Sequence, residues 1–449
     1  MLDLYRSRQP PPLGSVRFED IEAAAKKKLE QYPGAFDYAG GSAGTNSTYR
    51  ANLRALEVYR IIPRMLRDCT VRTLETTILG KKRTSPIFLA PIGVQGTFAE
   101  DGELGPARAA AKLGVPFIFS TASSRSIEQV AEVMGDSERW FQLYWPRTDE
   151  VTVSLLSRAK ANGYTNLIVT LDTTLLGWRP HDLLRSYLPF GHGVGSQIGT
   201  NDPVFLSRYP HLLNPSDKPL AAGDQNTEGK AFTDVLPPNW AEFPYHPGVV
   251  DKAFMEGMKG SKAPESQAAQ KGVLMGTELL KELNSGTFRT WEDLAFVRKT
   301  WGDHGKVLLK GIQSVEDAEK ALEVGVDGIV VSNHGGRQVD GALPSFIALL
   351  DITASPKIRE AQQAGNFTVL FDSGIRTGSD IIKAMAAGAQ GVLLGRPYLY
   401  GAILGGSTGV EQVIRQTLAD LDITMGNSGF KNLDEIWGKR EAVIRKLEL

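Results

Sequence analysis

The sequence predicts an α/β fold: a closed (β/α)8 TIM barrel with an N-terminal helical segment before it and a long insertion after its fourth strand. Eight short apolar runs recur from about residue 86, and stretches with helical spacing separate them. The runs do not alternate with polar residues, which indicates strands buried on both faces of a parallel sheet. They are Ile87–Ala90, Pro116–Ser120, Trp140–Tyr144, Leu167–Leu171, Val307–Lys310, Gly328–Ser332, Thr368–Asp372 and Gly391–Gly395.

The helical stretches between these runs complete the predicted strand–helix units. They are Gly105–Leu113, Ser126–Met134, Glu150–Ala161, Trp291–Thr300, Ser314–Val324, Ser345–Ala354 and Gly378–Ala387. A doubly wound open sheet is the rival fold, but it usually has a GxGxxG turn after its first strand, and Pro91-Ile92-Gly93 follows here instead. We therefore expect residues 86–449 to form the barrel, and residues 1–85 to form an arm and a helical segment that includes Phe18–Gln31.

The spacing between the fourth and fifth runs is too long for one helix. About 100 residues, roughly 186–285, are surplus, which is uncommon for a connection within a compact domain. Many prolines crowd this stretch and predict an irregular conformation on the carboxyl-end face of the barrel, where active sites lie. It could be an active-site lid, or a surface excursion or oligomer contact.

Composition excludes several classes of protein. With 50 Lys+Arg against 51 Asp+Glu, the net charge of −1 disfavours a nucleic-acid binder. The single cysteine, Cys69, excludes an intramolecular disulfide and a cysteine-rich metal site, and no metal site is predicted elsewhere. No apolar run is long enough to span a membrane, and the N-terminal residues contain no apolar signal segment. We expect a soluble cytoplasmic protein with no membrane partner.

Polar residues stand where the predicted strands end, and in a barrel these ends meet at one mouth. So many polar side chains at the mouth of one barrel indicate a ligand site and not a purely structural protein. The residues are Ser120, Gln142, Tyr144, Thr170, Asp172, Lys310, Ser332, His334, Arg337, Asp372, Arg376 and Arg396.

The last two strand ends predict a phosphate site. Gly374 and Gly395 allow backbone N–H groups to approach an anion, and Arg376 and Arg396 supply positive charge. Barrels often bind phosphate after strands seven and eight. The alternative is that the two arginines form surface ion pairs.

His334 is the histidine at a strand end, and it lies in a glycine-flanked loop. A histidine paired with a carboxylate such as Asp172 is suited to act as a general base, although a structural hydrogen bond is the alternative. Arg337 could clamp a carboxylate, and Arg179 adds a second cation near the same rim, unless it forms a salt bridge in the lid.

Lys310, predicted to be buried, needs an anionic partner or its pKa falls. It could form a Schiff base or lie beside an anionic ring. The phosphate site, together with hydrogen-bonding groups at Ser120, Gln142 and Thr170, favours a bound planar cofactor. These residues indicate a phosphate-bearing cofactor, a base and a carboxylate clamp, and hence proton abstraction from an organic acid with electrons passed to the cofactor.

The run Ser332-Asn333-His334-Gly335-Gly336-Arg337-Gln338 closely resembles the signature of the FMN-dependent 2-hydroxy acid oxidases and dehydrogenases. Further matching motifs cover nearly the whole chain in order. They are FDYAGGSAG (36–44), LAPIG (89–93), WFQLY (140–144), TLDT (170–173), LLKG (308–311), FDSGIRTGSD (371–380) and LLGRP (393–397). Within the family, the WRPHDL run (178–183) and the long insertion look most like lactate 2-monooxygenase.

The resemblance implies a role for each of these positions. His334 would be the base, oriented by Asp172, and Lys310 would neutralise the reduced flavin. Arg337, Arg179 and Tyr38 would hold the substrate carboxylate, and Tyr144 its hydroxyl. FMN would be contacted by Pro91, Ile92, Gly93, Ser120, Gln142, Thr170, Ser332, Asp372, Gly374, Arg376, Gly395 and Arg396.

Ala122 falls where glycolate oxidases have a bulky aromatic residue, so lactate or a longer acid is expected to fit better than glycolate. The polar insertion disfavours a membrane-bound mandelate dehydrogenase, and the lack of a preceding haem domain disfavours a flavocytochrome. The family suggests a homotetramer.

The first hypothesis is that L-lactate and O2 give acetate, CO2 and water. The alternatives are release of pyruvate and H2O2, electron transfer to an acceptor such as a quinone, and a flavin-binding scaffold without turnover.

Overall fold

Eight parallel strands close into a barrel in the computed structural model, which describes residues 2–209 and 247–448. Each strand pairs with its neighbour in the chain, and the last strand, β11, pairs with the first, β4. The predicted fold class is therefore confirmed. The strands are β4 (Ile87–Leu89), β5 (Phe117–Ser120), β6 (Arg139–Tyr144), β7 (Leu167–Thr170), β8 (Val307–Ile312), β9 (Gly328–Val331), β10 (Thr368–Phe371) and β11 (Gly391–Leu394).

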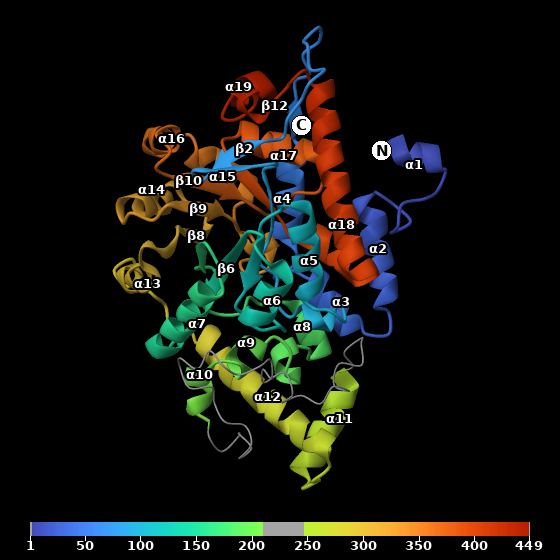
Figure 1. Ribbon diagram of the computed structural model, residues 1–449, viewed down its shortest axis with the longest axis vertical. Coiled ribbons are helices and arrows are strands. Elements are labelled where there is room, and N and C mark those ends of the chain that lie inside the picture. The colour runs from blue at the N-terminus through green and yellow to red at the C-terminus, as the bar shows by residue number, and fades with distance from the viewer. Residues whose placement is uncertain (1, 210–246, 449) are drawn as a thin grey trace.

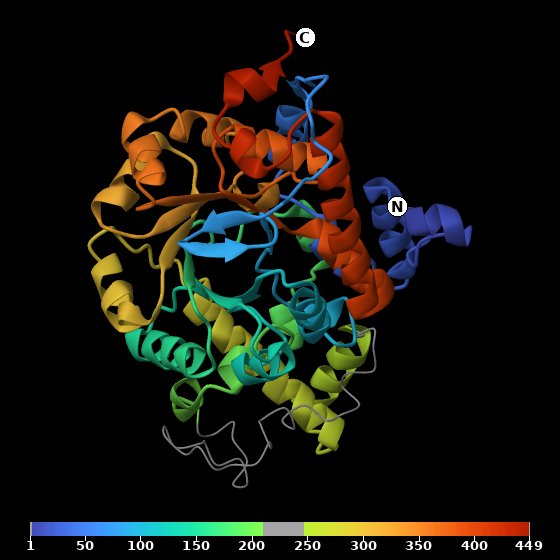
Figure 2. The ribbon, with the colours of Figure 1, turned by 45° about the horizontal axis from the view of Figure 1, so that its top comes forward.

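Helices surround the barrel and bury the outward-facing side chains of the strands (Figure 2). Small residues on these helices, such as Ala107 and Ala110 of α5, allow close packing against the sheet. The helices are α5 (Leu104–Leu113), α6 (Ile127–Met134), α7 (Asp149–Ala161), α13 (Leu294–Trp301), α14 (Val315–Glu323), α15 (Ser345–Ile352), α16 (Pro356–Gln363), α17 (Gly378–Ala386) and α18 (Arg396–Asn427).

A hairpin of β2 (Thr76–Ile78) and β3 (Lys81–Arg83) lies across the amino-terminal end of the barrel (Figure 2). Ile78 is fully buried in the apolar cluster that fills the barrel interior. The guanidinium of Arg83 lies 5.5 Å from the ring centre of Phe88, and it pairs with Glu138. The hairpin thus seals this end, so the cavity described below opens at the opposite, carboxyl end of the strands.

The N-terminal segment packs against the barrel helices from α2 onward, whereas α1 stands apart from them. It consists of α1 (Leu2–Ser7), α2 (Phe18–Lys28), α3 (Pro33–Gly40), α4 (Ser47–Glu57) and β1 (Tyr59–Ile61). Helix α2 lies beside the long α18 (Figure 1). The chain finishes with α19 (Arg440–Val443) and β12 (Ile444–Lys446), and β12 pairs with β1 in an antiparallel two-stranded sheet.

The described part of the predicted lid is helical, whereas the prolines led us to expect irregular chain. Pro203 and Pro264 each stand at the first position of a helix, where a missing N–H costs no hydrogen bond, as does Pro180 just before the predicted lid. The helices gather at one end of the molecule (Figure 1). They are α8 (Pro180–Arg185), α9 (Gln197–Thr200), α10 (Pro203–Ser207), α11 (Pro247–Met258) and α12 (Pro264–Leu283), with a 3-10 turn at Pro189–His192. Residues 210–246 of the predicted lid lie outside the described residues.

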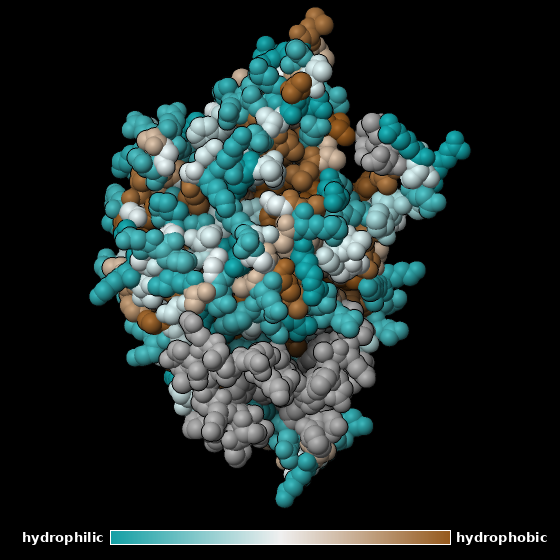
Figure 3. Space-filling model, in the orientation of Figure 1, coloured by the Kyte–Doolittle hydropathy of each residue, from teal (hydrophilic) through white to brown (hydrophobic). Residues whose placement is uncertain are grey.

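The face shown in Figure 3 is mostly hydrophilic, with hydrophobic side chains scattered over it. Across the part of the chain that is described, no helix has both the length and the apolar character required to cross a membrane.

Candidate active site

The positions of the site residues follow from the two-residue repeat of a strand. Eight apolar side chains fill the barrel interior: Phe88, Ile118, Trp140, Ile168, Leu308, Val330, Leu370 and Leu393. Because alternate side chains of a strand share a face, the residues two positions further along also point inward, one layer nearer the mouth. These residues are Ala90, Ser120, Gln142, Thr170, Lys310, Ser332, Asp372 and Gly395. The apolar layer is therefore the floor of the site.

Three members of the upper layer form a buried chain of hydrogen bonds. Ser120 Oγ donates to Gln142 Oε1 over 3.1 Å, and Gln142 Nε2 donates to Thr170 Oγ1 over 2.9 Å. The register pairs Ser120 with Gln142 and Thr170 with Lys310, which fixes their relative heights. This row therefore presents amide and hydroxyl groups in fixed positions.

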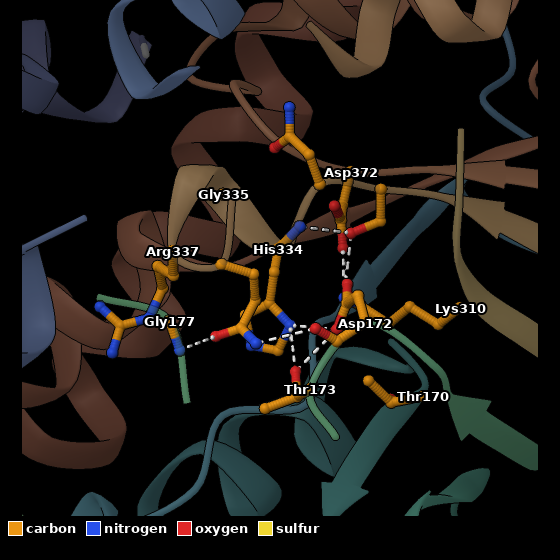
Figure 4. Close-up of polar contacts among 12 residues, drawn as sticks. Thr170, Asp172, Thr173, Gly177, Lys310, His334, Gly335, Arg337 and Asp372 are labelled. Carbon is orange, nitrogen blue, oxygen red and sulfur yellow. Dashed lines mark hydrogen bonds and ion pairs between the residues drawn. The ribbon is translucent and has the colours of Figure 1, made fainter. Parts of the chain in front are cut away.

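His334 and Asp172 form a half-buried pair although 162 residues separate them in the chain. His334 Nδ1 lies 2.8 Å from Asp172 Oδ1 (Figure 4). Burial raises the pKa of Asp172, but the charges of His334 and Lys310 outweigh it and hold this pKa well below its usual range. Burial lowers the pKa of His334, and Asp172 offsets only part of that effect. At neutral pH the pair is therefore a carboxylate and a neutral imidazole, the state required of a general base.

The loop that carries His334 is strained and is held by neighbouring hydroxyl groups. His334 has a φ of 58°, in the left-handed region that non-glycine residues seldom occupy. Its N–H donates to Ser332 Oγ over 3.0 Å, and the N–H of Gly335 donates to Ser373 Oγ over 2.9 Å. Such strain persists where the surroundings over-determine it, and it is often found at functional sites.

Lys310 is a buried cation at the centre of the upper layer. Its ammonium group donates to Ser332 Oγ over 3.0 Å and lies 3.4 Å from Asp372 Oδ2. Burial lowers the pKa of Lys310, but Asp372 and Asp172 outweigh that effect and raise it. Lys310 therefore stays charged at neutral pH, which is not the state that Schiff-base formation requires.

Two guanidinium groups flank Tyr38 at the mouth of the barrel. The Cζ atoms of Arg337 and Arg179 lie 5.1 Å and 5.9 Å from the centre of its ring. Burial, followed by the charge of Arg179, lowers the pKa of Arg337 to about 10. The nearest carboxylate, Asp182, lies 4.0 Å from Arg179. One buried and one half-buried guanidinium group on the same aromatic ring, with Asp182 only at the limit of ion-pair distance, favour a bound anion.

One cavity is lined by Tyr38, Arg179, Lys310, His334 and Arg337. Tyr144 lines it beside His334, with the two rings nearly parallel and their centres 6.5 Å apart. Ala122 lines it next to Gly93, and apolar side chains close it from the outer side. The outer residues are Phe98, Leu176, Phe190 and Leu283.

The comparisons with known proteins assign the family. A model of the FMN-dependent dehydrogenase family matches residues 25–445. The chain belongs to this family. It is similar to an FMN-dependent alpha-hydroxy acid dehydrogenase of Penicillium citrinum, with 40% identity over 89% of this chain and 84% of the relative.

Other members share most of the chain. An L-lactate oxidase of Lysinibacillus sphaericus is 32% identical over 93% of this chain and 90% of its own length. A crystal structure of mandelate oxidase is 30% identical, with a TM-score of 0.69, over 95% of this chain and 97% of that chain. The family is named for FMN, which has an anionic phosphate and a flavin ring with a polar edge.

The cavity carries unsatisfied donors where a flavin phosphate would bind. Arg376 Nε and Nη2 and Arg396 Nε are buried without a hydrogen-bond partner among the described residues, and both arginines line the cavity. Gly395 precedes α18, and a side chain there would project into open space in the cavity. The N-terminus of α18 adds backbone N–H groups that favour an anion. These residues fit the phosphate of FMN.

The segment after β4 brings backbone close to the other wall of the cavity. A Cβ atom at Gly93 would lie 2.5 Å from the carbonyl oxygen of Ala122, so the close approach requires glycine. Pro91, Ile92 and Gly93 all line the cavity. The row from Ser120 to Thr170 and the charge of Lys310 also fit the polar edge and the anionic reduced form of a flavin ring.

The structure brings the residues predicted from the sequence into one region. Most line the cavity: Tyr38, Pro91, Ile92, Gly93, Ala122, Tyr144, Arg179, Lys310, His334, Arg337, Asp372, Gly374, Arg376, Gly395 and Arg396. Five others do not line it: Asp172 and Ser332 are hydrogen-bonded to His334 and Lys310, and Ser120, Gln142 and Thr170 bond to one another. The individual roles of all these residues stay predictions.

Sequence reasoning missed several residues that contact this set. Thr173 Oγ1 donates to Asp172 Oδ1 over 2.7 Å and lies 3.2 Å from His334 Nδ1. Ser373 joins the His334 loop to Asp372, and Asn284, at the end of α12, donates to the carbonyl of Thr173 over 2.7 Å. Thr173 and Ser373 are in motifs recognised from the sequence, each next to a strand-end carboxylate, and that adjacency was the available signal.

Proposed function

We propose that this FMN-dependent enzyme oxidises L-lactate, an (S)-2-hydroxy acid, with O2 as the electron acceptor, and converts it to acetate, CO2 and water. The observation that supports this proposal most directly is that His334, which is paired with Asp172, lines one cavity together with Arg179, Arg337 and Lys310. A 2-hydroxy acid has the two features that these groups match, a carboxylate and a proton to be removed from its hydroxyl-bearing carbon.

The two arginines would bind the substrate carboxylate. Arg337 Nη1 is occupied by the carbonyl oxygens of Tyr38 and Gly41, each over 2.7 Å, which holds the side chain in place and leaves its other donors available. Tyr144 would donate to the substrate hydroxyl, because burial raises its pKa and keeps the phenol protonated. The substrate's second carbon would then face the neutral imidazole of His334.

The dyad would remove the substrate proton. With Nδ1 hydrogen-bonded to Asp172, the imidazole of His334 keeps Nε2 free as the base, and the carboxylate stabilises the imidazolium that forms. FMN, when bound, supplies the acceptor for the two electrons. Lys310 would supply the positive charge that favours this transfer.

The walls of the cavity favour a small acid with an alkyl group. Ala122 is short, and Phe98, Phe190 and Leu283 provide apolar surface on the outer side. Leu283 and Asn284 belong to the end of the predicted lid, residues 186–285, so this segment would enclose the product. Pyruvate retained beside hydrogen peroxide would undergo oxidative decarboxylation, which is the proximity argument for acetate.

Two alternatives remain within the same chemistry. The enzyme could release pyruvate and H2O2, as an oxidase, and the similarity to an L-lactate oxidase favours this outcome. It could instead pass electrons to another acceptor, and the relatives named dehydrogenases favour that one.

The deciding experiments measure reduction and products separately. Anaerobic titration of the yellow protein with a panel of 2-hydroxy acids should bleach the flavin, most efficiently with L-lactate; absence of bleaching with every acid would refute the proposed function. Aerobic turnover should then yield acetate and CO2. Free pyruvate with stoichiometric H2O2 would support the oxidase, and slow reoxidation by air in a stopped-flow experiment would support the dehydrogenase.

A further inference from the structure

Gln338 lies outside the cavity, but its side-chain amide makes four hydrogen bonds to the segment that carries Asp172 and Arg179. Its Nε2 donates to the carbonyl oxygens of Asp172, over 2.7 Å, and Leu175, over 2.8 Å. Its Oε1 accepts from Arg179 Nη2 over 2.8 Å and from the N–H of Gly177 over 3.2 Å. Two donors and two acceptor sites are all that a side-chain amide has, so the group is fully used.

These bonds join two loops that follow different strands. Residues 172–179 come after β7, and His334 to Gln338 come after β9. Arg179 Nε also donates to the carbonyl of Arg337 over 2.9 Å. At Gly177 a Cβ atom would lie 2.4 Å from that carbonyl oxygen, so the loops touch along their backbones. These contacts therefore join the loop that carries Asp172 and Arg179 to the loop that carries His334 and Arg337.

The geometry points to Gln338 as a positioning residue that orients Arg179 toward the substrate carboxylate. The inference rests on the proposed function, since it assumes that Arg179 and Arg337 bind a carboxylate. Without the acceptor at Gln338, the buried guanidinium of Arg179 would keep its bond to the Arg337 carbonyl and the distant Asp182. Its side chain could then rotate away from Tyr38 and from the bound anion.

A purely structural role for Gln338 predicts a different result. Loss of four hydrogen bonds should lower the melting temperature in either case. Only the positioning role predicts weaker binding of a carboxylate, and it predicts that this loss depends on Arg179. A double-mutant cycle isolates such dependence, because two residues that act through one contact give non-additive effects.

The experiment measures the Kd of propionate on the FMN-loaded enzyme by titration calorimetry. Propionate has the carboxylate of lactate but no hydroxyl to oxidise. Gln338→Leu should weaken its binding about tenfold, as expected when one charged hydrogen bond is lost. In the Arg179→Met background the same substitution should change Kd by less than about twofold. The control Val339→Ala alters an exposed neighbouring side chain and should bind propionate as the parent does.

Gln338→Glu provides a second variant if Gln338→Leu does not fold. Glutamate still accepts from Arg179, but its negative charge offsets that of the arginine, and it cannot donate the two hydrogen bonds that Gln338 donates. Gln338→Glu alone should therefore also weaken propionate binding. In the Arg179→Met background it should have little effect. An unchanged Kd in a folded Gln338 variant would overturn the inference. So would an equal loss with and without Arg179. If propionate does not bind the parent enzyme, the carboxylate site itself is wrong and the positioning role falls with it.

Discussion

Asp172→Asn is the substitution that tests the proposed base most directly. Asparagine has the shape of aspartate but cannot stabilise a protonated His334 by charge. It can also present its NH2 group to Nδ1, which would move the imidazole proton to Nε2 and block the atom that must accept the substrate proton. Burial already lowers the pKa of His334 and keeps the imidazole neutral at pH 7. The substitution therefore cannot raise the fraction of enzyme that holds a neutral base, and nothing offsets the lost charge.

The size of the effect follows from the contact. The two atoms are 2.8 Å apart and half-buried, and a hydrogen bond to a charged group contributes about 1.5–3 kcal/mol. Two unit charges about 4 Å apart at an effective dielectric constant near 20 attract by about 4 kcal/mol, which sets the upper end. At 1.36 kcal/mol per tenfold, flavin reduction should slow by about 10- to 1,000-fold.

Anaerobic stopped-flow mixing with saturating L-lactate, followed by the loss of flavin absorbance, measures this rate directly. Asp327→Asn is the control, because Asp327 pairs with Lys306 at the amino-terminal ends of β8 and β9, at the other end of the barrel from the cavity, and this variant should be reduced at the parental rate. A rate for the Asp172 variant within a few-fold of the parent would refute the idea that the carboxylate stabilises the developing imidazolium.

Other groups give further expectations. Lys310→Met should slow flavin reduction and release FMN more readily, and retention of the parental rate and FMN affinity would contradict its charge-neutralising role. For lactate, kcat/KM should be constant above about pH 7 and decrease as pH falls, with a midpoint below the usual pKa of about 6.5, because burial lowers the pKa of His334; a midpoint above 7 would oppose this assignment. Asp340→Ala should lower the free energy of unfolding by about 1 kcal/mol, since Asp340 accepts from the backbone and hydroxyl of Ser47 at the start of α4, as an N-cap does; urea unfolding with an unchanged midpoint would contradict it.

The barrel could be predicted from the sequence because its strands are buried on both faces. Each becomes an uninterrupted apolar run, and the run ends where the mouth begins, so Lys310 and Asp372 could be placed at strand ends. The hairpin Thr76–Arg83 was missed because its strands have three residues each, too few for a periodic pattern. The helix Pro264–Leu283 was missed because the prolines between residues 203 and 247 made the whole insertion look irregular.

The residues of the candidate site could be predicted from the sequence better than the hydrogen bonds that join them. A charged residue at a buried strand end is conspicuous, as with Lys310 and Asp172. A short polar residue beside it, such as Thr173 or Ser373, fits equally well in a turn, and its partner depends on how distant loops meet. The same is true of Gln338, which was visible in the motif but acquires its four partners only in the folded chain.

Each barrel strand contributes one apolar side chain to the floor of the site, and most strands contribute a functional side chain two residues further along. Deleting one residue from a strand such as β8 would move Lys310 to the side that faces the helices. An apolar neighbour would then point toward the site in its place. A slip of that kind would remove a functional group even if the barrel closed again. Length changes should therefore be accepted in the segments between strands, and engineering of this scaffold should substitute side chains within strands without altering their frame.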